Sequence, residues 1–459
     1  MGIYGALSSA VTGLRAQSHA LENISGNIAN SQTTGYKRIE TSFLDLIPDA
    51  PLKSQVPGAV LAQSRGTNGL VGDIQTSSTE TYIALNAGGF FVVEPKIGQS
   101  DGNSVFAGSN YFTRRGDFEL DKEGRLVNGA GYYLKGLPVD QSTGNISGSV
   151  PEVLKLSNAF LAANKTTNIN YRANLPQVPN TENYDPETAG SELMDITAYS
   201  NYVAPATTLN TIRGSDHERF TSDSIYGGAI TVYAANGAPA SVQLRWAKVD
   251  SHASGGADTW SLYYMSDSDA AAGADKWTRV PQSYSFNLNG SMDPPVTETT
   301  IPGLTINGVN VGNVTLSHDR NGMSQFADVN GTASVSQLDQ NGYGAGEFQS
   351  VAISDDGRVV ATYSNGERID MAQVVVAQFN AVNSLKRLDG GVFQTTTESG
   401  EPIFDLSGSG ILGGALEASN TDISDEFTKL IITQQAYSAG TRIVSTADEM
   451  LQEALNMVR

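Results

Sequence analysis

The chain has 459 residues, a formal net charge of −20 at pH 7 and no cysteine. This length suits two to four domains, each with its own core. The acidic balance argues against nucleic acid and against an anionic membrane surface, because both partners require a basic patch. The lack of cysteine excludes disulfides, thiolate metal sites and cysteine nucleophiles.

The first residues do not have the composition of a targeting or membrane segment. No basic residue precedes Arg15 and no continuous apolar run follows, which is unlike a secretory signal peptide. No stretch approaches the roughly 20 apolar residues that cross a bilayer. We therefore expect a cytoplasmic protein, or one that is exported without a cleaved leader, and no membrane insertion.

Residues 1–32 predict a helix with one apolar edge. Apolar residues recur here in alternating steps of four and three, the heptad spacing of a helix that packs along a seam against another helix. Few charged residues interrupt the segment. The predicted seam consists of Leu7, Val11, Leu14, Leu21 and Ile28.

Residues 418–459 predict a longer helix of the same design. Thr421 or Asp422 can cap its N-terminus, and Asp425 and Glu426 in the first turn suit the helix dipole. Most amphipathic helices pack on a core of their own chain, but these two lie at opposite chain ends, outside β-type sequence. We therefore expect both seams to form inter-subunit coiled-coil contacts. The second seam consists of Ile423, Phe427, Leu430, Tyr437, Val444, Leu451, Leu455 and Val458.

The sequence between the helices is rich in Gly, Ser, Thr and Asn and predicts short strands. Residues 118–127 and 351–360 both alternate apolar residues around an acidic turn, which predicts two hairpins. Further strands are expected at 230–233, 242–246 and 260–264.

These patterns predict a mainly β fold with α-helical termini, in which two or more β-rich domains are inserted in nested fashion. Whether the outer domain is one unit or two is left open. The expected parts are a terminal helical coiled-coil domain (1–32 and 418–459), an extended connecting segment or linker (33–75), a β-rich middle domain (76–150 and 341–417) and an outer β domain (151–340).

Candidate catalytic and metal-binding motifs are weak. Asp216-His217-Glu218 has no second histidine nearby, so we interpret it as a solvated loop. Residues 98–102 have the spacing of a nucleophile elbow without a following helix, and 408–413 have dinucleotide spacing without a following parallel strand. The sequence therefore predicts no catalytic residue, no metal site and no cofactor. Aromatic residues that could stack on sugars are more often core residues: Trp246, Trp260 and Trp277.

Short signatures at both ends resemble those of the flagellar rod and hook protein family. Residues 27–30 read Asn-Ile-Ala-Asn, and 33–37 read Thr-Thr-Gly-Tyr-Lys. Residues 414–420 and 434–437 are similar to the matching C-terminal signature. The segment 343–348, together with its neighbours up to 388, resembles hook subunits in particular. One segment, 186–222, departs from the family pattern.

The resemblance implies a structural subunit of the bacterial flagellar hook and not an enzyme. Such a subunit polymerises with its own copies into a curved, flexible tube that transmits motor torque as a universal joint and contains an export channel. Other implied partners are the distal rod, the hook cap, the hook–filament junction protein, the hook-length ruler and the flagellar export apparatus. The implied location is extracellular, at the flagellar hook.

Two alternatives stay open at this stage. A distal rod or hook–filament junction subunit shares the terminal signatures, although the chain length and the segment around 343–388 favour a hook subunit. A secreted β-rich hydrolase or adhesin is the alternative from another class, since many carboxylates are present and sequence alone does not exclude a catalytic pair among them.

Overall fold

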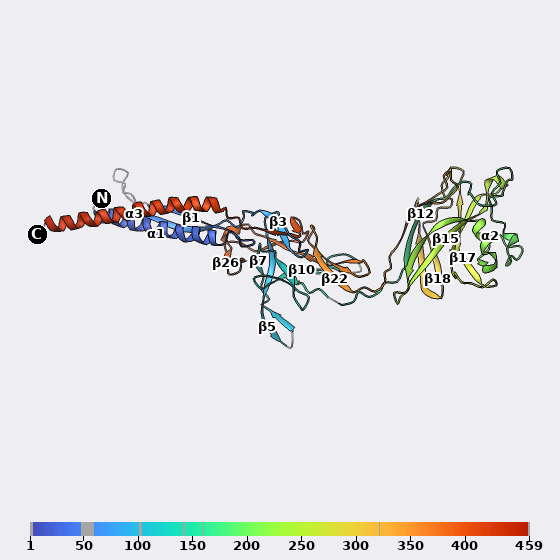
Figure 1. Cartoon of the computed structure of the whole chain (residues 1–459), viewed down its shortest axis with the longest axis horizontal. Coiled ribbons are helices and arrows are strands. Elements are labelled where there is room, and N and C mark those ends of the chain that lie inside the picture. The colour runs from blue at the N-terminus through green and yellow to red at the C-terminus, as the bar shows by residue number, and fades with distance from the viewer. Residues whose placement is uncertain are drawn as a thin grey trace. The chain divides into compact units, whose positions relative to one another are not determined.

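A computed structural model describes residues 3–46, 59–100, 103–140, 143–157, 159–320 and 322–457. The chain forms two compact units (Figure 1). Unit 1 contains residues 1–158, 349–362 and 368–459, and unit 2 contains residues 159–348 and 363–367. The chain thus leaves unit 1, builds unit 2 and returns, which confirms the predicted nested, mainly β fold with helical ends.

Two long helices of unit 1 pair within the chain: α1 (Ile3–Ala29) and α3 (Ile423–Met457). They run antiparallel, with both chain ends at the same end of the pair (Figure 1). At one close approach, a Cβ added to Gly440 would lie 2.9 Å from Cδ2 of Leu14. Sequence analysis placed both helices in one coiled-coil domain and expected their seams to contact other copies; the structure covers part of both seams within one chain.

A two-stranded antiparallel hairpin covers one side of α1. It consists of β1 (Ile39–Leu46) and β2 (Ala59–Gly66). Asn23 Nδ2 donates to Thr41 Oγ1 at 2.9 Å, and the imidazole of His19 lies 3.0 Å from Ser64 Oγ. The segment expected as a linker therefore contains strands that are held on a helix.

The remaining strands of unit 1 form one large sheet and two small ribbons, built on a core that includes Phe90, Phe112 and Phe393. The hairpins predicted around 118–127 and 351–360 are confirmed as β8–β9 and β22–β23. The strands are β3 (Ile74–Thr76), β4 (Ile83–Leu85), β5 (Phe90–Ser100), β6 (Asn103–Phe106), β7 (Tyr111–Thr113), β8 (Phe118–Leu120), β9 (Leu126–Asn128), β10 (Tyr132–Pro138), β11 (Glu152–Val153), β22 (Phe348–Ile353), β23 (Arg358–Tyr363), β24 (Arg368–Val374), β25 (Val376–Gln378), β26 (Lys386–Leu388), β27 (Val392–Gln394), β28 (Ile403–Asp405), β29 (Ile411–Gly413) and β30 (Ala415–Glu417).

Unit 2 consists of two five-stranded sheets that share one core, with Tyr171 from one sheet and Trp246 from the other. All three tryptophans are buried, as core residues, and the strands predicted near 230, 244 and 262 are confirmed. One sheet contains β12 (Asn168–Asn174), β18 (Glu298–Ile306), β19 (Val309–Ser317), β20 (Met323–Ser324) and β21 (Ser334–Gln340). The other contains β13 (Thr211–Arg213), β14 (Ile225–Tyr233), β15 (Pro239–Asp250), β16 (Asp258–Met265) and β17 (Asp275–Phe286).

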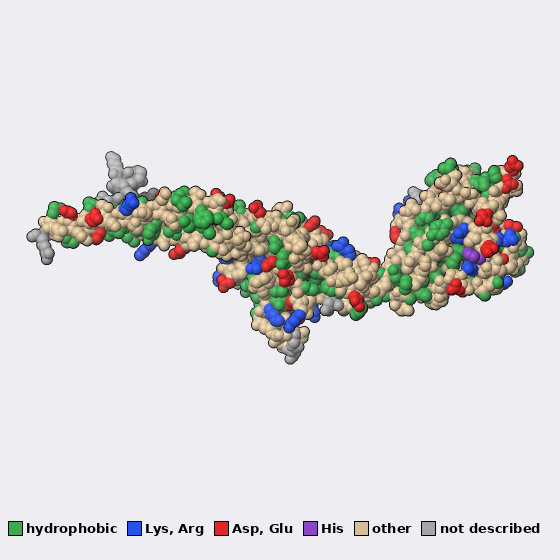
Figure 2. Space-filling view, viewed as in Figure 1, with side chains coloured by type: hydrophobic (Ala, Val, Ile, Leu, Met, Phe, Trp, Pro, Cys, Tyr) green, Lys and Arg blue, Asp and Glu red, His purple; other side chains and the backbone are tan. Residues whose placement is uncertain are grey.

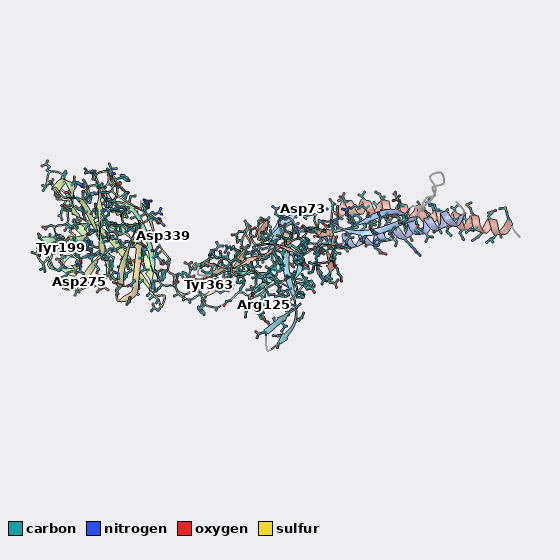
Figure 3. The ribbon with its side chains drawn as sticks, turned by 180° about the vertical axis from the view of Figure 1, so that it is seen from behind. Asp73, Arg125, Tyr199, Asp275, Asp339 and Tyr363 are labelled. Atoms are coloured by element: carbon teal, nitrogen blue, oxygen red, sulfur yellow. The ribbon has the colours of Figure 1, made fainter. Side chains whose placement is uncertain are left out.

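The segment that departs from the family pattern packs on the second sheet of unit 2. Tyr199, labelled in Figure 3, is buried there, and its hydroxyl donates to Asp223 at 2.8 Å. Phe220 of the short helix α2 (His217–Ser222) joins the same cluster. His217 begins this helix and accepts a hydrogen bond from Trp277 at 3.1 Å, so our interpretation of a solvated loop is wrong.

His318 links the two halves of the unit 2 core while fully buried. Its Nε2 lies 2.8 Å from the hydroxyl of Tyr284 and its Nδ1 lies 3.0 Å from the carbonyl of Tyr171. A neutral ring satisfies both contacts, because Nδ1–H donates to the carbonyl while Nε2 accepts from the hydroxyl. Burial accordingly lowers the pKa of His318 from its ordinary value of 6.5.

We therefore expect unit 2 to lose stability as pH falls below about 6.5. In that range the unfolded chain protonates His318 while the folded chain does not, which favours unfolding by up to about 1.4 kcal/mol per pH unit until the lowered folded pKa is reached. Urea unfolding followed by tryptophan fluorescence measures this, since all three tryptophans lie in unit 2. His318→Gln should flatten the pH slope, and an unchanged slope in this variant would contradict the assignment.

Candidate functional site

The motifs that sequence analysis considered as possible reactive sites do not form such sites in the described residues. Among them no group of three or more His, Cys, Asp or Glu residues is placed to hold a metal ion. Gly98 lies in β5 with strand β6 after it, and residues 411–413 form β29 opposite β4, so neither glycine motif leads into a helix. No helix in the described ranges is long and apolar enough to cross a membrane.

A buried triad of charged side chains, Lys37, Arg114 and Glu417, joins the N-terminal signature to the C-terminal one. Glu417 of β30 accepts from Lys37 and, at 3.1 Å, from Nη1 of Arg114. All three side chains are excluded from solvent. Burial lowers the pKa of both Lys37 and Arg114, which the carboxylate of Glu417 partly opposes. The two signatures are thus one structural element, held by one anion between two cations.

Close backbone packing accompanies the triad. Gly35 has a φ of 66°, and a Cβ there would lie 2.7 Å from the carbonyl carbon of Arg114. Its amide donates to the carbonyl of Glu417 at 2.8 Å. The guanidinium of Arg387 lies 4.3 Å from the ring centre of Tyr36 and donates to the carbonyl of Lys37 at 2.7 Å. Glycine is required at position 35 because any side chain would meet the Arg114 backbone.

A buried polar contact joins the last turn of α1 to the first turn of α3. Asn27 Nδ2 donates to Glu426 Oε2 at 2.9 Å and to the carbonyl of Ile39 at 2.9 Å. Asn27 Oδ1 accepts from the amide of Ile39 and the hydroxyl of Tyr36. Every hydrogen-bonding position of the amide is used. Asn27 therefore connects α1 at once to α3 and to the start of the hairpin.

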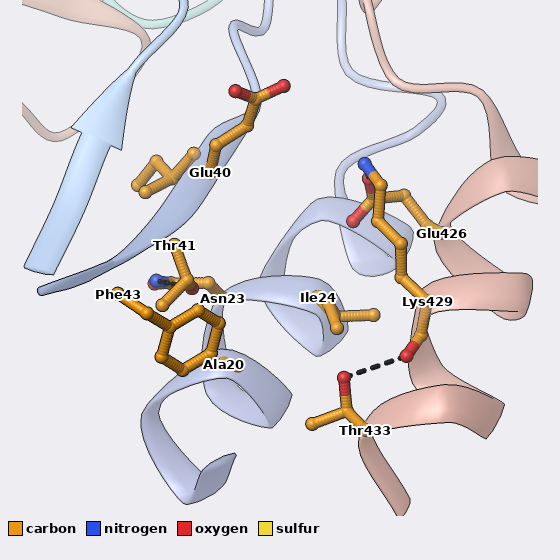
Figure 4. Close-up of a pocket in the computed structure, with 10 residues that line it drawn as sticks. Ala20, Asn23, Ile24, Glu40, Thr41, Phe43, Glu426, Lys429 and Thr433 are labelled. Atoms are coloured by element: carbon orange, nitrogen blue, oxygen red, sulfur yellow. Dashed lines mark hydrogen bonds and ion pairs between the residues drawn. The ribbon is translucent and has the colours of Figure 1, made fainter. Parts of the chain in front are cut away.

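Beside this contact, α1, α3 and β1 line a small cavity of about 230 Å³ that is open to solvent (Figure 4). Its floor is Ala20 and Ile24, with Phe43 on the hairpin side and Lys429 and Thr433 on the α3 side. Phe43 remains 46% exposed. The cavity shows that the three elements leave apolar surface uncovered within one chain.

The predicted seam residues fall into three groups. Half-buried in the chain are Leu7, Leu14, Leu21, Ile28, Leu430, Val444 and Leu451. Exposed are Val11, Ile423, Phe427, Tyr437 and Leu455. Val458 lies outside the described residues. The helix pair thus covers part of both seams and leaves the rest at the surface, where Figure 2 shows apolar side chains along the pair.

Sequence reasoning missed a second apolar stripe on α3. It begins at Ile432 and ends at Met457, and its four large side chains are 52% to 80% exposed. The spacing of four and three was present in the sequence, but two alanines within it weakened the signal. The members of the stripe, called the α3 stripe below, are Ile432, Ala436, Ala439, Ile443, Met450 and Met457.

Four family models match the chain in order. They are described as "Flagella basal body rod protein" (residues 7–37), "Flagellar hook protein FlgE/F/G D1 domain" (84–159), "Flagellar basal body protein FlaE D2 domain" (206–343) and "Flagellar basal body rod FlgEFG protein C-terminal" (412–457). The first match contains α1 from Leu7 onward and the N-terminal signature, and the last contains α3 and the C-terminal signature.

Curated relatives match over the whole length. The flagellar hook protein FlgE of Brucella suis is 29% identical and covers 100% of both chains, and that of Escherichia coli is 28% identical over 98% of this chain and 100% of its own. A crystal structure of Helicobacter pylori flagellar hook protein FlgE2 is similar with a TM-score of 0.47 at 14% identity, covering 75% of this chain and 99% of that one.

The two paired helices come first and last in the chain and the nested β units lie between them in sequence. Family matches at both ends and in both units define a structural protein of the flagellar axis. The chain belongs to the flagellar hook protein family. Membership implies self-polymerisation within the axial structure of the flagellum, outside the cell body.

Proposed function

We propose that this chain is the hook subunit that polymerises into a curved, flexible tube through its terminal helices. The observation that supports this is the apolar surface of the helix pair. Two paired helices normally bury their large apolar residues, yet Phe427, Ile432 and Ile443 are each at least 50% exposed. Complete burial of a fully exposed side chain of this size is worth roughly 1.5–3 kcal/mol, and the part that is still exposed here gains its share when it is covered. Contact with further copies supplies that burial.

Torque transmission follows from how the helices are attached. A buried ion triad and the Asn27 contact hold the helix pair to the β part of unit 1. A load applied to the helices therefore reaches the sheet through hydrogen bonds and ion pairs that water does not screen. The helices form the inner layer around the export channel in this proposal, and the β units face outward.

The remaining partners belong to the same proposal. A tube of this kind starts on the distal rod, grows under a hook cap to a length set by a ruler, and ends at a junction protein. The subunit reaches its place through the flagellar export apparatus. It performs no catalysis, because its work is mechanical.

Electron microscopy of the purified chain under polymerising conditions tests the function. We expect curved tubes with a central channel. Straight, short rods would instead favour a rod or junction subunit. Dispersed monomers with hydrolase or adhesive activity would overturn the assignment.

A further inference from the structure

One turn of unit 1 contains an asparagine whose side chain is folded over the next peptide bond. Asn128 ends β9, and residues 129–131 lead from it into β10. Its Oδ1 accepts from the amide of Ala130 at 3.1 Å and from the amide of Tyr132 at 3.0 Å. A bond from Oδ1 to the amide two residues further on defines an Asx turn. This turn places the side-chain carbonyl carbon, Cγ, beside the backbone nitrogen of Gly129.

An asparagine that precedes glycine is open to attack by its own backbone. Glycine has no side chain, so its nitrogen can approach Cγ of the asparagine closely. When this nitrogen bonds to Cγ, the side-chain amide leaves as ammonia and a five-membered imide forms. Water then opens the imide, so that the net reaction replaces the amide of asparagine by a carboxyl group and releases ammonia. The chain and water supply every atom of this reaction.

Three features of the turn favour the reaction at Asn128. Oδ2 of Asp117 accepts from the amide of Gly129 at 3.3 Å and is placed to take the proton that this nitrogen loses. The two amides that bind Oδ1 stabilise the negative charge on this oxygen during the attack. The leaving group, Nδ2 of Asn128, has no hydrogen-bond acceptor among the described residues, so no bond to another group has to break before it departs.

The carboxylate of Asp117 is held against Gly129. Arg115 Nε donates to Asp117 Oδ1 at 2.7 Å, and Arg115 Nη2 donates to Oδ2 at 2.9 Å. A Cβ at position 129 would lie 2.7 Å from Asp117 Oδ2, so any larger residue there would push the carboxylate aside. Gly129 is also exposed. Water can therefore carry the proton from Asp117 to the departing ammonia, and it can reach the imide.

The same tripeptide recurs in unit 2 without a base. Residues 236–238 read Asn-Gly-Ala, as do residues 128–130. The alanine amide donates to Asn236 Oδ1 at 3.1 Å, which is the same Asx turn. The amide of Gly237, however, donates to the carbonyl of Ala234 at 2.9 Å, and a neutral carbonyl does not act as a base. The two sites share a tripeptide and a turn, and they differ in the group that faces the attacking nitrogen.

We propose that Asn128 is a site of self-catalysed deamidation, with Asp117 as the catalytic base. The nitrogen of Gly129 bonds to Cγ as its proton passes to Asp117, and the bond from Cγ to Nδ2 breaks as Nδ2 takes up a proton and leaves as ammonia. Water then opens the imide on either side. Opening to aspartate keeps the main chain, and the new carboxylate accepts from the same two amides. Opening to isoaspartate adds a carbon to the main chain, which breaks the register between Val127 and Tyr133.

Peptide mass spectrometry of the full chain, incubated at neutral pH, compares the two tripeptides in one sample. In the folded chain we expect Asn128 to be converted at least about tenfold faster than Asn236. In concentrated urea the difference should disappear, because the unfolded chain gives both tripeptides the same surroundings. Equal rates in the folded chain, or faster conversion of Asn236, would overturn the proposal.

Two variants test the role of Asp117, and both break the same ion pair. Asp117→Asn removes the base and should slow the conversion of Asn128 at least about tenfold. Arg115→Gln keeps the carboxylate, so conversion in this variant should be at least as fast as in the natural chain. Asn236 serves as the reference in each sample, and its rate should not change. If both variants slow the conversion of Asn128 equally, the ion pair and not the base governs the rate, and the role of Asp117 is overturned.

Discussion

Replacing Glu417 with Gln is expected to lower the free energy of unfolding of unit 1 by about 3–5 kcal/mol. Glu417 is the one anion between Lys37 and Arg114, and all three side chains are excluded from solvent. The amide leaves two buried cations without a counter-charge, whose desolvation then has no compensation. Because α1 ends shortly before Lys37 and α3 begins shortly after Glu417, the loss of stability should also appear in the helices.

Denaturant unfolding followed by the helical circular dichroism signal measures this effect, since α1 and α3 belong to unit 1. Tryptophan fluorescence provides an internal control and should not change, because the tryptophans report on unit 2. The matched variant is Glu40→Gln, which removes the partner of Arg38 at a site 42% exposed. It should cost less than about 1 kcal/mol. If both variants lose the same free energy of unfolding, the buried triad stabilises the chain no more than the exposed ion pair does, which would contradict this prediction.

Replacing Ile443 with Asp is expected to abolish polymerisation while the free chain stays folded. Ile443 is 52% exposed in one chain, so the carboxylate remains hydrated there. The proposed assembly covers the same position with another copy, and burying an unpaired carboxylate there costs several kcal/mol at every contact. The concentration needed for assembly should rise at least about 100-fold, which corresponds to roughly 3 kcal/mol.

The control for charge is Gln435→Asp, which adds the same carboxylate at an exposed position outside the α3 stripe. Its assembly should remain close to that of the natural chain, as followed by sedimentation and electron microscopy. If both variants polymerise equally well, the α3 stripe takes no part in assembly. If both fail, net charge and not the stripe governs assembly.

Much of the fold was predictable because the local signals are strong. Heptad spacing and the capping residue Asp422, whose carboxylate accepts from the amide of Ser424 at 2.7 Å, define α3. Alternation of apolar and polar residues around acidic turns predicted the β8–β9 and β22–β23 hairpins. The hairpin over α1 was missed, since Phe43, Leu44 and Leu61 give no clean alternation between a buried and a solvated face.

The site was less predictable, for reasons of chain topology. Lys37 and Glu417 belonged to signatures that the sequence analysis recognised, but Arg114 lies between them in the chain and only the fold brings it to the same carboxylate. The contact between α1 and α3 uses small residues such as Gly440, which carry no hydrophobic pattern. The inter-subunit role of the two predicted seams stays a prediction.

Thiol reactivity at position 443 tests most directly whether other copies cover the apolar faces of the helix pair. The natural chain has no cysteine, so Ile443→Cys carries a single thiol. We expect rapid labelling by a maleimide in free subunits, at least about tenfold slower labelling in polymers, and recovery on disassembly. Labelling at the same rate in subunits and polymers would contradict the account, because the helix faces would then remain in water after assembly.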